Sequence, residues 1–331
     1  MFDVVALGES LIDCTPAGKN EMGMDLFSCN PGGAPANVLA MNAKLGGKTA
    51  FIGMVGHDSF GAFLKDTMDQ AGIDTQNLCM SDEYRTTLAF VQLDHEGNRS
   101  FSFYRKPGAD VMLTSGDVNA SLLMSCHIFH FGGVSLTDDP CRTTTLKAAQ
   151  MAKESGAIIS YDPNYRPALW KDSTEAKAVL SSAAAVADVI KVSDEELTLL
   201  TGETDCRTGA QRLAAMGPSI ILVTMGKKGS FFYTAEHSFS LPTYHVSEKD
   251  TTGAGDAFLG ALHNCIRNKS LRELLQMEKD EWRERIGFAN AAGSLTTTKK
   301  GAIPAMPDRA EISALMQSGS YENAGQQCVN A

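Results

Sequence analysis

The chain has 331 residues, of which 43% are hydrophobic and 21% charged, and its formal net charge at pH 7 is -10. This length can bury a sizeable core, and the acidic balance argues against non-specific binding to nucleic acid or anionic membranes, because both are polyanions. No apolar run approaches the roughly 20 residues of a membrane helix, no basic leader precedes the first apolar run, and the eight cysteines contain no C-x-x-C pair. We therefore expect a cytoplasmic protein with reduced thiols, no nucleic-acid or membrane partner and no zinc site.

The first third of the chain alternates between strand and helix patterns. The apolar run that ends at Gly8 predicts a buried strand, and later helical spacings are stopped by Gly46 and Gly72. Residues 86–104 instead alternate apolar and polar residues on both sides of a turn at 95–98, which predicts a β-hairpin. The predicted order before the hairpin is strand 2–7, helix 34–45, strand 49–55 and helix 60–70.

After the hairpin, strands and helices alternate again, which predicts a mostly parallel sheet. We expect strands at 128–131, 157–161, 189–192 and 220–224, and helices at 141–154, 175–186, 208–216, 255–266 and 281–295. The fold class is therefore α/β, with three layers and helices on both faces of the sheet. We expect one domain over 1–316, with β-lid segments at about 13–31 and 86–106, and a polar, flexible tail at 317–331.

The strongest local signal is D-T-T-G-A-G-D-A-F at residues 250–258. Small residues before an apolar helix leave backbone N–H groups unobstructed at the helix N-terminus, and such an end attracts anions. Asp is also a common helix cap, so this segment alone leaves phosphate chemistry and a plain cap equally open.

The same segment resembles the C-terminal signature of the ribokinase-like carbohydrate kinases. N-P-G-G-A-P-A-N at 30–37, followed by K-L-G-G at 44–47 and G-M-V-G at 53–56, resembles the N-terminal signature of that family. The resemblance extends from about Val4 to Pro304. It implies the ribokinase-like fold and an ATP-dependent transfer of phosphate to a sugar hydroxyl.

The resemblance also implies the roles of the residues around the transferred phosphate and the sugar. Asp256 would be the catalytic base, and an ordinary pKa of about 4 would leave it ionised at neutral pH. The backbone of Gly253, Ala254 and Gly255 would form the anion hole for the γ-phosphate. The floor under the sugar would comprise Asp13, Gly32, Gly33 and Asn37, although a turn after a strand and a loop are the alternatives for these residues.

The nucleotide and the metals are assigned in the same way. Glu196 would act on magnesium through water, because Mg²⁺ tends to keep its waters, whereas Ser193 stands where many relatives carry asparagine. Asp250 and Thr252, with the loop 299–301, would lie near a potassium ion. The remaining expected nucleotide neighbours are Lys191, Thr224, Gly226, Gly229 and Asn290.

The choice of sugar depends on two further segments. D-P-N-Y-R-P-A-L-W at 162–170 is similar to a stretch shared by fructokinases and 2-keto-3-deoxygluconate kinases, and its Arg166 suits either a phosphate or a carboxylate. The segment 101–110 resembles a fructokinase lid, in which Phe103 and Arg105 would face the sugar from above, although an edge hairpin with buried aromatic residues is an equal alternative. Fructose is the first choice of substrate, a ketoacid the second, and a catalytically silent sugar sensor the alternative from another class. Relatives also suggest a homodimer formed through the lid.

Overall fold

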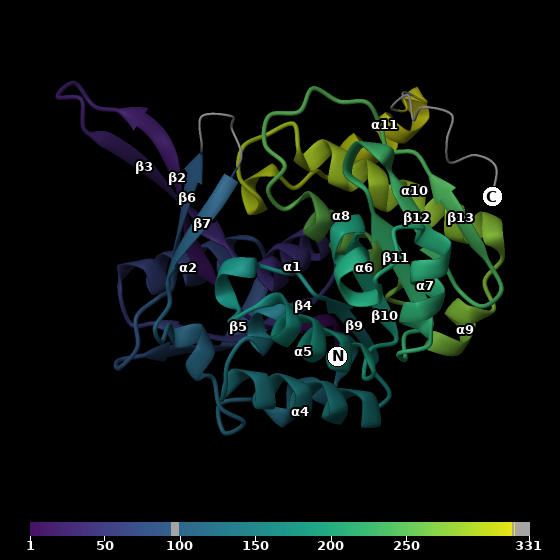
Figure 1. Cartoon of the computed structure of the whole chain (residues 1–331), viewed down its shortest axis with the longest axis horizontal. Coiled ribbons are helices and arrows are strands. Elements are labelled where there is room, and N and C mark those ends of the chain that lie inside the picture. Colours follow the sequence, from purple (N-terminus) through teal and green to yellow (C-terminus); the bar gives the residue numbers. More distant parts are fainter. Residues whose placement is uncertain (94–98, 320, 322–331) are drawn as a thin grey trace.

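The computed structural model describes residues 1–93, 99–319 and 321. Its centre is a nine-stranded sheet with the order β13-β12-β11-β10-β9-β8-β1-β4-β5 (Figure 1). All neighbours from β11 to β5 pair in parallel, and only β12 and β13 run antiparallel. The strands are β1 (Phe2–Leu7), β4 (Thr49–Gly56), β5 (Ile73–Ser81), β8 (Cys126–Gly132), β9 (Ile158–Asp162), β10 (Val189–Ser193), β11 (Ile220–Thr224), β12 (Ser230–Tyr233) and β13 (Ser238–Leu241).

Helices cover both faces of this sheet, because its central strands are apolar on both sides. One core lies under α1 (Ala34–Lys44), α2 (Ser59–Gln70), α8 (Ala254–Ile266), α9 (Leu271–Leu275), α10 (Lys279–Thr296) and α11 (Arg309–Ser318). The other lies under α3 (Ala120–Leu123), α4 (Cys141–Glu154), α5 (Ser173–Ala184), α6 (Asp194–Thr201) and α7 (Cys206–Ala214). Single helical turns are η1 (Ala109–Met112), η2 (Gly133–Leu136), η3 (Pro167–Leu169), η4 (Gly226–Lys228) and η5 (Ile303–Ala305). The three-layer α/β prediction is confirmed.

A second, four-stranded sheet projects from one end of the molecule (Figure 1). Its order is β3-β2-β6-β7, with β2 (Leu11–Lys19), β3 (Asp25–Gly32), β6 (Leu88–Leu93) and β7 (Arg99–Tyr104). The predicted hairpin is confirmed as the antiparallel pair β6–β7, and its predicted turn at 95–98 lies outside the described residues. The parallel pairing of β2 with β6 joins the two hairpins into one sheet.

Several elements differ from the sequence prediction. β12, β13 and α6 were not predicted, because short elements carry too few periods of the apolar pattern to be recognised. β5 was not predicted because polar residues interrupt its apolar pattern. The tail was predicted to be loose from residue 317, but α11 extends to Ser318 and Tyr321 forms a bridge with Tyr244, their ring centres 4.9 Å apart. None of the helices in the described part of the chain is both long enough and apolar enough to cross a membrane.

Candidate active site

The candidate site lies where the chain reverses its direction of travel across the sheet, between β1 and β8. Parallel strands end on the same edge, and ligands of open α/β sheets bind outside those carboxyl ends. Asp162, Ser193 and Thr224 are the last residues of β9, β10 and β11, so their side chains reach this edge together. The sheet thereby assembles residues that are far apart in the sequence.

Asp256 lies in the first turn of α8, and the turn before it requires glycine. Gly253 has a φ of 76°, and a Cβ added there would lie 2.6 Å from the Cβ of Ala302. The side-chain amide of Asn37 donates to Asp256 Oδ2 over 2.8 Å. The structure thus joins the two signatures, 219 residues apart, through one buried hydrogen bond.

Burial changes the chemistry expected of Asp256. Burial raises the pKa of Asp256 and the nearby Asp162 raises it further, while Lys191, the Asn37 hydrogen bond and Arg166 oppose the rise. The expectation of an ordinary pKa of about 4 is therefore wrong, because the sequence does not reveal how little water reaches the carboxyl. A raised pKa brings a general base nearer to neutral pH, where such a base works best.

Lys191 and Asp162 form a buried ion pair beside the start of α8. Lys191 Nζ lies 2.5 Å from Asp162 Oδ2, and the two side chains are 8% and 1% exposed. A Cβ on Gly255 would lie 3.1 Å from Lys191 Nζ, so the ammonium group faces the first turn of α8. Backbone N–H groups and a fixed cation together make an anion site at this point.

Asp162 was not assigned a role from the sequence, although it opens the D-P-N-Y-R segment that was used to choose the sugar. Its position directly after an apolar strand is the signal that could have identified it, because strand ends gather at one edge of a parallel sheet.

The side chains of Ser193 and Glu196 form hydrogen bonds with backbone groups at the start of α6. Ser193 Oγ accepts from the Glu196 N–H over 3.1 Å, and Glu196 Oε2 accepts from the Ser193 N–H over 2.8 Å, which is a capping box at the start of α6. Glu196 Oε1 also accepts from the Tyr165 N–H over 2.7 Å and so anchors the segment that carries Arg166. Burial and Asp162 raise the pKa of Glu196. The serine that departs from the family pattern therefore has a structural role of its own.

The predicted sugar floor is brought together around Asp13. A Cβ on Gly32 would lie 2.3 Å from Asp13 Oδ2, and a Cβ on Gly33, whose φ is 119°, would lie 2.4 Å from the Glu9 carbonyl oxygen. Burial raises the pKa of Asp13 to about 6, and the Arg166 charge opposes this rise. Among the described residues none donates a hydrogen bond to the Asp13 carboxyl, so its oxygens are free to accept hydroxyl groups.

Arg105 lies differently from the expectation that it faces the sugar from the lid. Its Nε donates to Asp110 Oδ2 and its Nη1 to the Thr137 hydroxyl, both over 2.7 Å, and the whole residue is 9% exposed. The sequence could not indicate this, because the partners come from segments beyond the hairpin. Phe103 faces Ala89 across the β6–β7 pair and is half-buried. Contact of either residue with sugar remains a prediction.

Glu9 is a second buried carboxyl near the floor that sequence reasoning missed. Its Oε1 accepts from the Ala34 N–H over 3.0 Å at the start of α1, and burial raises its pKa to about 7. Arg105 lowers this pKa and Asp110 raises it, so Glu9 links the sugar floor to the Arg105 pair. Its position shortly after the apolar strand that ends before Gly8 was the available sequence signal.

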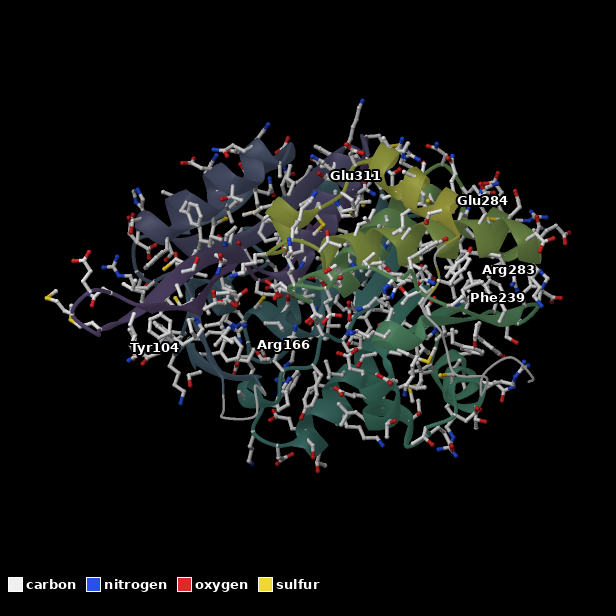
Figure 2. All side chains as sticks on the ribbon, turned by 90° about the horizontal axis from the view of Figure 1, so that it is seen from above. Tyr104, Arg166, Phe239, Arg283, Glu284 and Glu311 are labelled. Carbon is white, nitrogen blue, oxygen red and sulfur yellow. The ribbon has the colours of Figure 1, made fainter. Side chains whose placement is uncertain are left out.

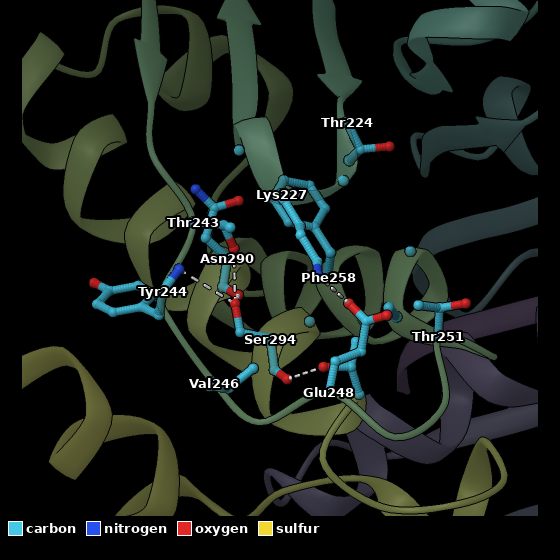
Figure 3. Close-up of a pocket in the computed structure, with 16 residues that line it drawn as sticks. Thr224, Lys227, Thr243, Tyr244, Val246, Glu248, Thr251, Phe258, Asn290 and Ser294 are labelled. Carbon is cyan, nitrogen blue, oxygen red and sulfur yellow. Dashed lines mark hydrogen bonds and ion pairs between the residues drawn. The ribbon is translucent and has the colours of Figure 1, made fainter. Parts of the chain in front are cut away.

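A cavity of about 480 Å³ opens beside the first turn of α8 (Figure 3). Its wall includes the predicted nucleotide neighbours Thr224, Gly226, Gly229 and Asn290, together with Ala254 and Gly255 of the predicted anion hole. Lys227, which was not predicted, reaches across it toward Glu248, at 3.6 Å. Phe258 adds an apolar surface, and such a mixture of apolar wall and few polar groups is typical of a cofactor cleft. Lys191, Ser193 and Glu196 are not part of this wall and lie toward the strand ends.

The two loops predicted to hold a monovalent cation do meet. The Gly301 N–H donates to Asp250 Oδ2 over 3.1 Å, and the Thr252 hydroxyl donates to Asp250 Oδ1 over 2.7 Å. The Asp250 side chain thus ties the loop before α8 to the loop after α10.

Comparisons with known proteins agree with this geometry. A model of the "pfkB family carbohydrate kinase" matches residues 1–309. The chain is 44% identical to "Probable fructokinase-2" of Arabidopsis thaliana over 315 residues, which are 93% of this chain and 94% of that protein. It is 42% identical to "Fructokinase-1" of Oryza sativa subsp. japonica, over 95% of this chain and 98% of that protein.

Solved structures are similar over nearly the whole chain. Fructokinase with bound ATP from Xylella fastidiosa has a TM-score of 0.89 at 33% identity, covering 96% of this chain and 99% of that one. Fructokinase from Vibrio cholerae O395, with fructose, ADP and calcium ion bound, has a TM-score of 0.85 at 35% identity, covering 95% and 98%.

Proposed function

Because the chain belongs to the pfkB family of carbohydrate kinases, we propose that it transfers the γ-phosphate of MgATP to fructose and forms fructose 6-phosphate. The observation that carries this proposal is the position of Asp256 between the 480 Å³ cavity and the Asp13 floor, held by Asn37 over 2.8 Å. The relatives named fructokinases, at 42–44% identity, support fructose as the acceptor.

Each residue then has a defined task in the transfer. Asp13 and the glycine floor bind the sugar hydroxyls, while Asn37 orients the Asp256 carboxylate. Asp256 accepts the proton of the attacking hydroxyl as the new O–P bond forms. The N–H groups at the start of α8 and the Lys191 ammonium stabilise the negative charge on the transferred group. Bound MgATP supplies the phosphoryl group and a divalent charge on its phosphates.

The residues at the site fit magnesium held through water. No cluster of three or more His, Cys, Asp or Glu side chains in the described ranges could hold a metal directly. Asp162 and Glu196 each keep lone pairs beyond the hydrogen bonds they accept, and Mg²⁺ commonly binds through one or two carboxylates, waters and phosphates. We also propose that potassium binds near the Asp250 and Thr252 carbonyls.

Substrate preference tests the proposal directly. ATP consumption with magnesium and potassium would be compared for D-fructose, 2-keto-3-deoxygluconate, ribose and adenosine. Fructose should give the highest kcat/KM. A higher value for the ketoacid would assign the Arg166 guanidinium to a carboxylate and overturn fructose, and binding of fructose without ATP consumption would point to a sensor.

We further propose that the protein is a cytoplasmic homodimer formed through the small sheet. Met22, Met24, Leu26, Phe27 and Tyr104 are each between 44% and 78% exposed there, an apolar group that a second copy would cover. Sedimentation analysis of the protein and of Phe27→Ser tests this, because a dimer that persists unchanged in the variant would refute the proposed face.

A further inference from the structure

A second cavity, of about 460 Å³, lies among α8, α10 and α11. It is separated from the nucleotide cavity by α10. A Cβ on Gly287 would lie 3.8 Å from Met316 Cε and 3.8 Å from Tyr244 Oη, and these residues line the second and the first cavity respectively. The proposed reaction uses no residue of this second cavity.

Two arginines of its wall, the exposed Arg309 and the half-buried Arg285, have hydrogen-bond partners but no acidic partner among the described residues. The Arg309 guanidinium lies 5.3 Å from the centre of the Phe288 ring and donates to Asn264 Oδ1 over 2.8 Å. Arg285 Nη1 donates to the Glu281 carbonyl over 2.9 Å, while its Nε is buried and finds no acceptor within the described part of the chain. Neither arginine forms an ion pair with any described residue. The two arginines therefore place positive charge at one cavity of a protein whose net charge is -10.

The charges of these arginines converge on one point of the cavity wall, the thiol of Cys265. Burial raises the pKa of Cys265 to about 11, while Arg309, Arg285 and Arg267 each act to lower it. Glu284, which also lines the cavity, raises this pKa. The cavity therefore has a cationic region around Cys265 and a carboxylate on another side.

The other side chains of the cavity wall indicate which groups a bound anion would carry besides its negative charge. Ser313 and Gln317 from α11 offer hydroxyl and amide groups, and Glu284 can accept from a hydroxyl donor. Phe288 also lines the cavity, with the Arg309 guanidinium over its ring. In Figure 2, the side chain of Arg283 in α10 projects toward Phe239, whereas Glu284 lies on another side of this helix. Arg283 therefore does not belong to the wall of the second cavity.

We propose that this cavity is a second binding site, distinct from the active site, for a phosphorylated polyol of the sugar-phosphate class. Arg285 and Arg309 bind the phosphate, since guanidinium groups match phosphate oxygens in a planar fork. Glu284, Ser313 and Gln317 bind the hydroxyl groups. Fructose 6-phosphate, the product of the proposed function, belongs to this ligand class. The second site follows from the residues of the cavity, however, and the experiment below measures binding and not catalysis.

Protection of the Cys265 thiol measures occupancy of this cavity. The protein would be alkylated with iodoacetamide at pH 8.5, with fructose 6-phosphate, fructose or inorganic phosphate as the probe, and Cys265 followed by peptide mass spectrometry. Fructose 6-phosphate should slow the labelling of Cys265 at least about fivefold and leave the half-buried Cys79 unchanged. Fructose should not protect. Equal protection by inorganic phosphate at the same concentration would overturn the sugar-phosphate assignment.

Four variants distinguish this site from the active site and from misfolding. Arg309→Gln should abolish the protection, Arg309→Lys should retain part of it, and Arg283→Gln, which changes an exposed arginine of α10, should leave it intact. Asp13→Asn, which disables the proposed sugar floor, should also leave the protection intact. Loss of protection in Asp13→Asn, or its persistence in Arg309→Gln, would overturn the proposal, and a melting temperature no lower than that of the wild type excludes unfolding as the cause in each variant.

Discussion

Replacement of Asp13 by asparagine should stabilise the fold while it weakens sugar binding. The carboxyl is buried, and its pKa is raised from 3.8 to about 6. One pKa unit corresponds to about 1.36 kcal/mol, so the ionised group costs the folded state about 3 kcal/mol at neutral pH. Asparagine fills nearly the same volume without the charge, and so removes this cost.

The sign of the pH dependence follows from the direction of the pKa change. The folded carboxyl holds its proton more tightly than the unfolded one, so stability decreases as pH rises from about 4 to about 6 and stays lower above that range. The stability advantage of Asp13→Asn should therefore be absent near pH 3.5 and nearly complete at pH 7.5. Urea unfolding at both values measures it, provided that the unfolding is two-state.

Sugar binding should change with pH in the opposite direction to stability and become stronger as pH rises. Only the ionised carboxyl accepts two hydroxyl groups, and with a pKa of about 6 it is ionised to about nine tenths at pH 7 and about one tenth at pH 5. The kcat/KM for fructose should then fall roughly tenfold between these values in the wild type. An Asp13→Asn variant that is less stable than the wild type at pH 7.5, or whose stability difference is independent of pH, would refute this reasoning.

Three further changes test the rest of the site. Asp256→Asn should lower kcat by roughly 10²–10⁴ with fructose binding retained, as measured by coupled assay and calorimetry, and near-normal turnover would remove its role as base. Lys191→Met should leave Asp162 charged and unpaired in the core, and should lower the free energy of unfolding in denaturant by about 3–5 kcal/mol. An unchanged free energy of unfolding would contradict a stabilising role of this ion pair. Gly33→Ala should destabilise the fold by at least about 1–3 kcal/mol, because φ is 119° and the added Cβ would lie 2.4 Å from the Glu9 carbonyl; an unchanged melting temperature would contradict the strain.

The long elements were predictable because their apolar periods repeat several times. The strand before Gly8, the helix after Gly33 and the two long C-terminal helices all lie within a few residues of their predicted bounds. β12 and β13 were missed, since a short strand gains its stability from its neighbours in the sheet more than from its own pattern. β5 was missed because polar residues interrupt its apolar pattern. α6 was hidden inside the S-D-E-E motif, whose capping role was not considered.

The candidate site likewise combines residues that were predicted from the sequence with features that only the structure reveals. The roles of Asp256, Asn37 and Gly253 were predicted from the resemblance to the carbohydrate kinases, and the structure brings these three residues together. The raised pKa of Asp256, the pairing of Lys191 with Asp162 and the inward position of Arg105 were not, because each depends on which distant segments exclude water.

By itself, the sequence determined the fold class from its local patterns, and its resemblance to the carbohydrate kinases indicated the kinase chemistry and the residues of the two signatures. Only the tertiary structure decided the protonation of the buried carboxyls, the ion pair at the end of β9 and β10, and the arginine-lined second cavity. The physical reason is that electrostatic energies depend on burial and on distance between charges, and the parallel sheet sets both by bringing remote strand ends to one edge.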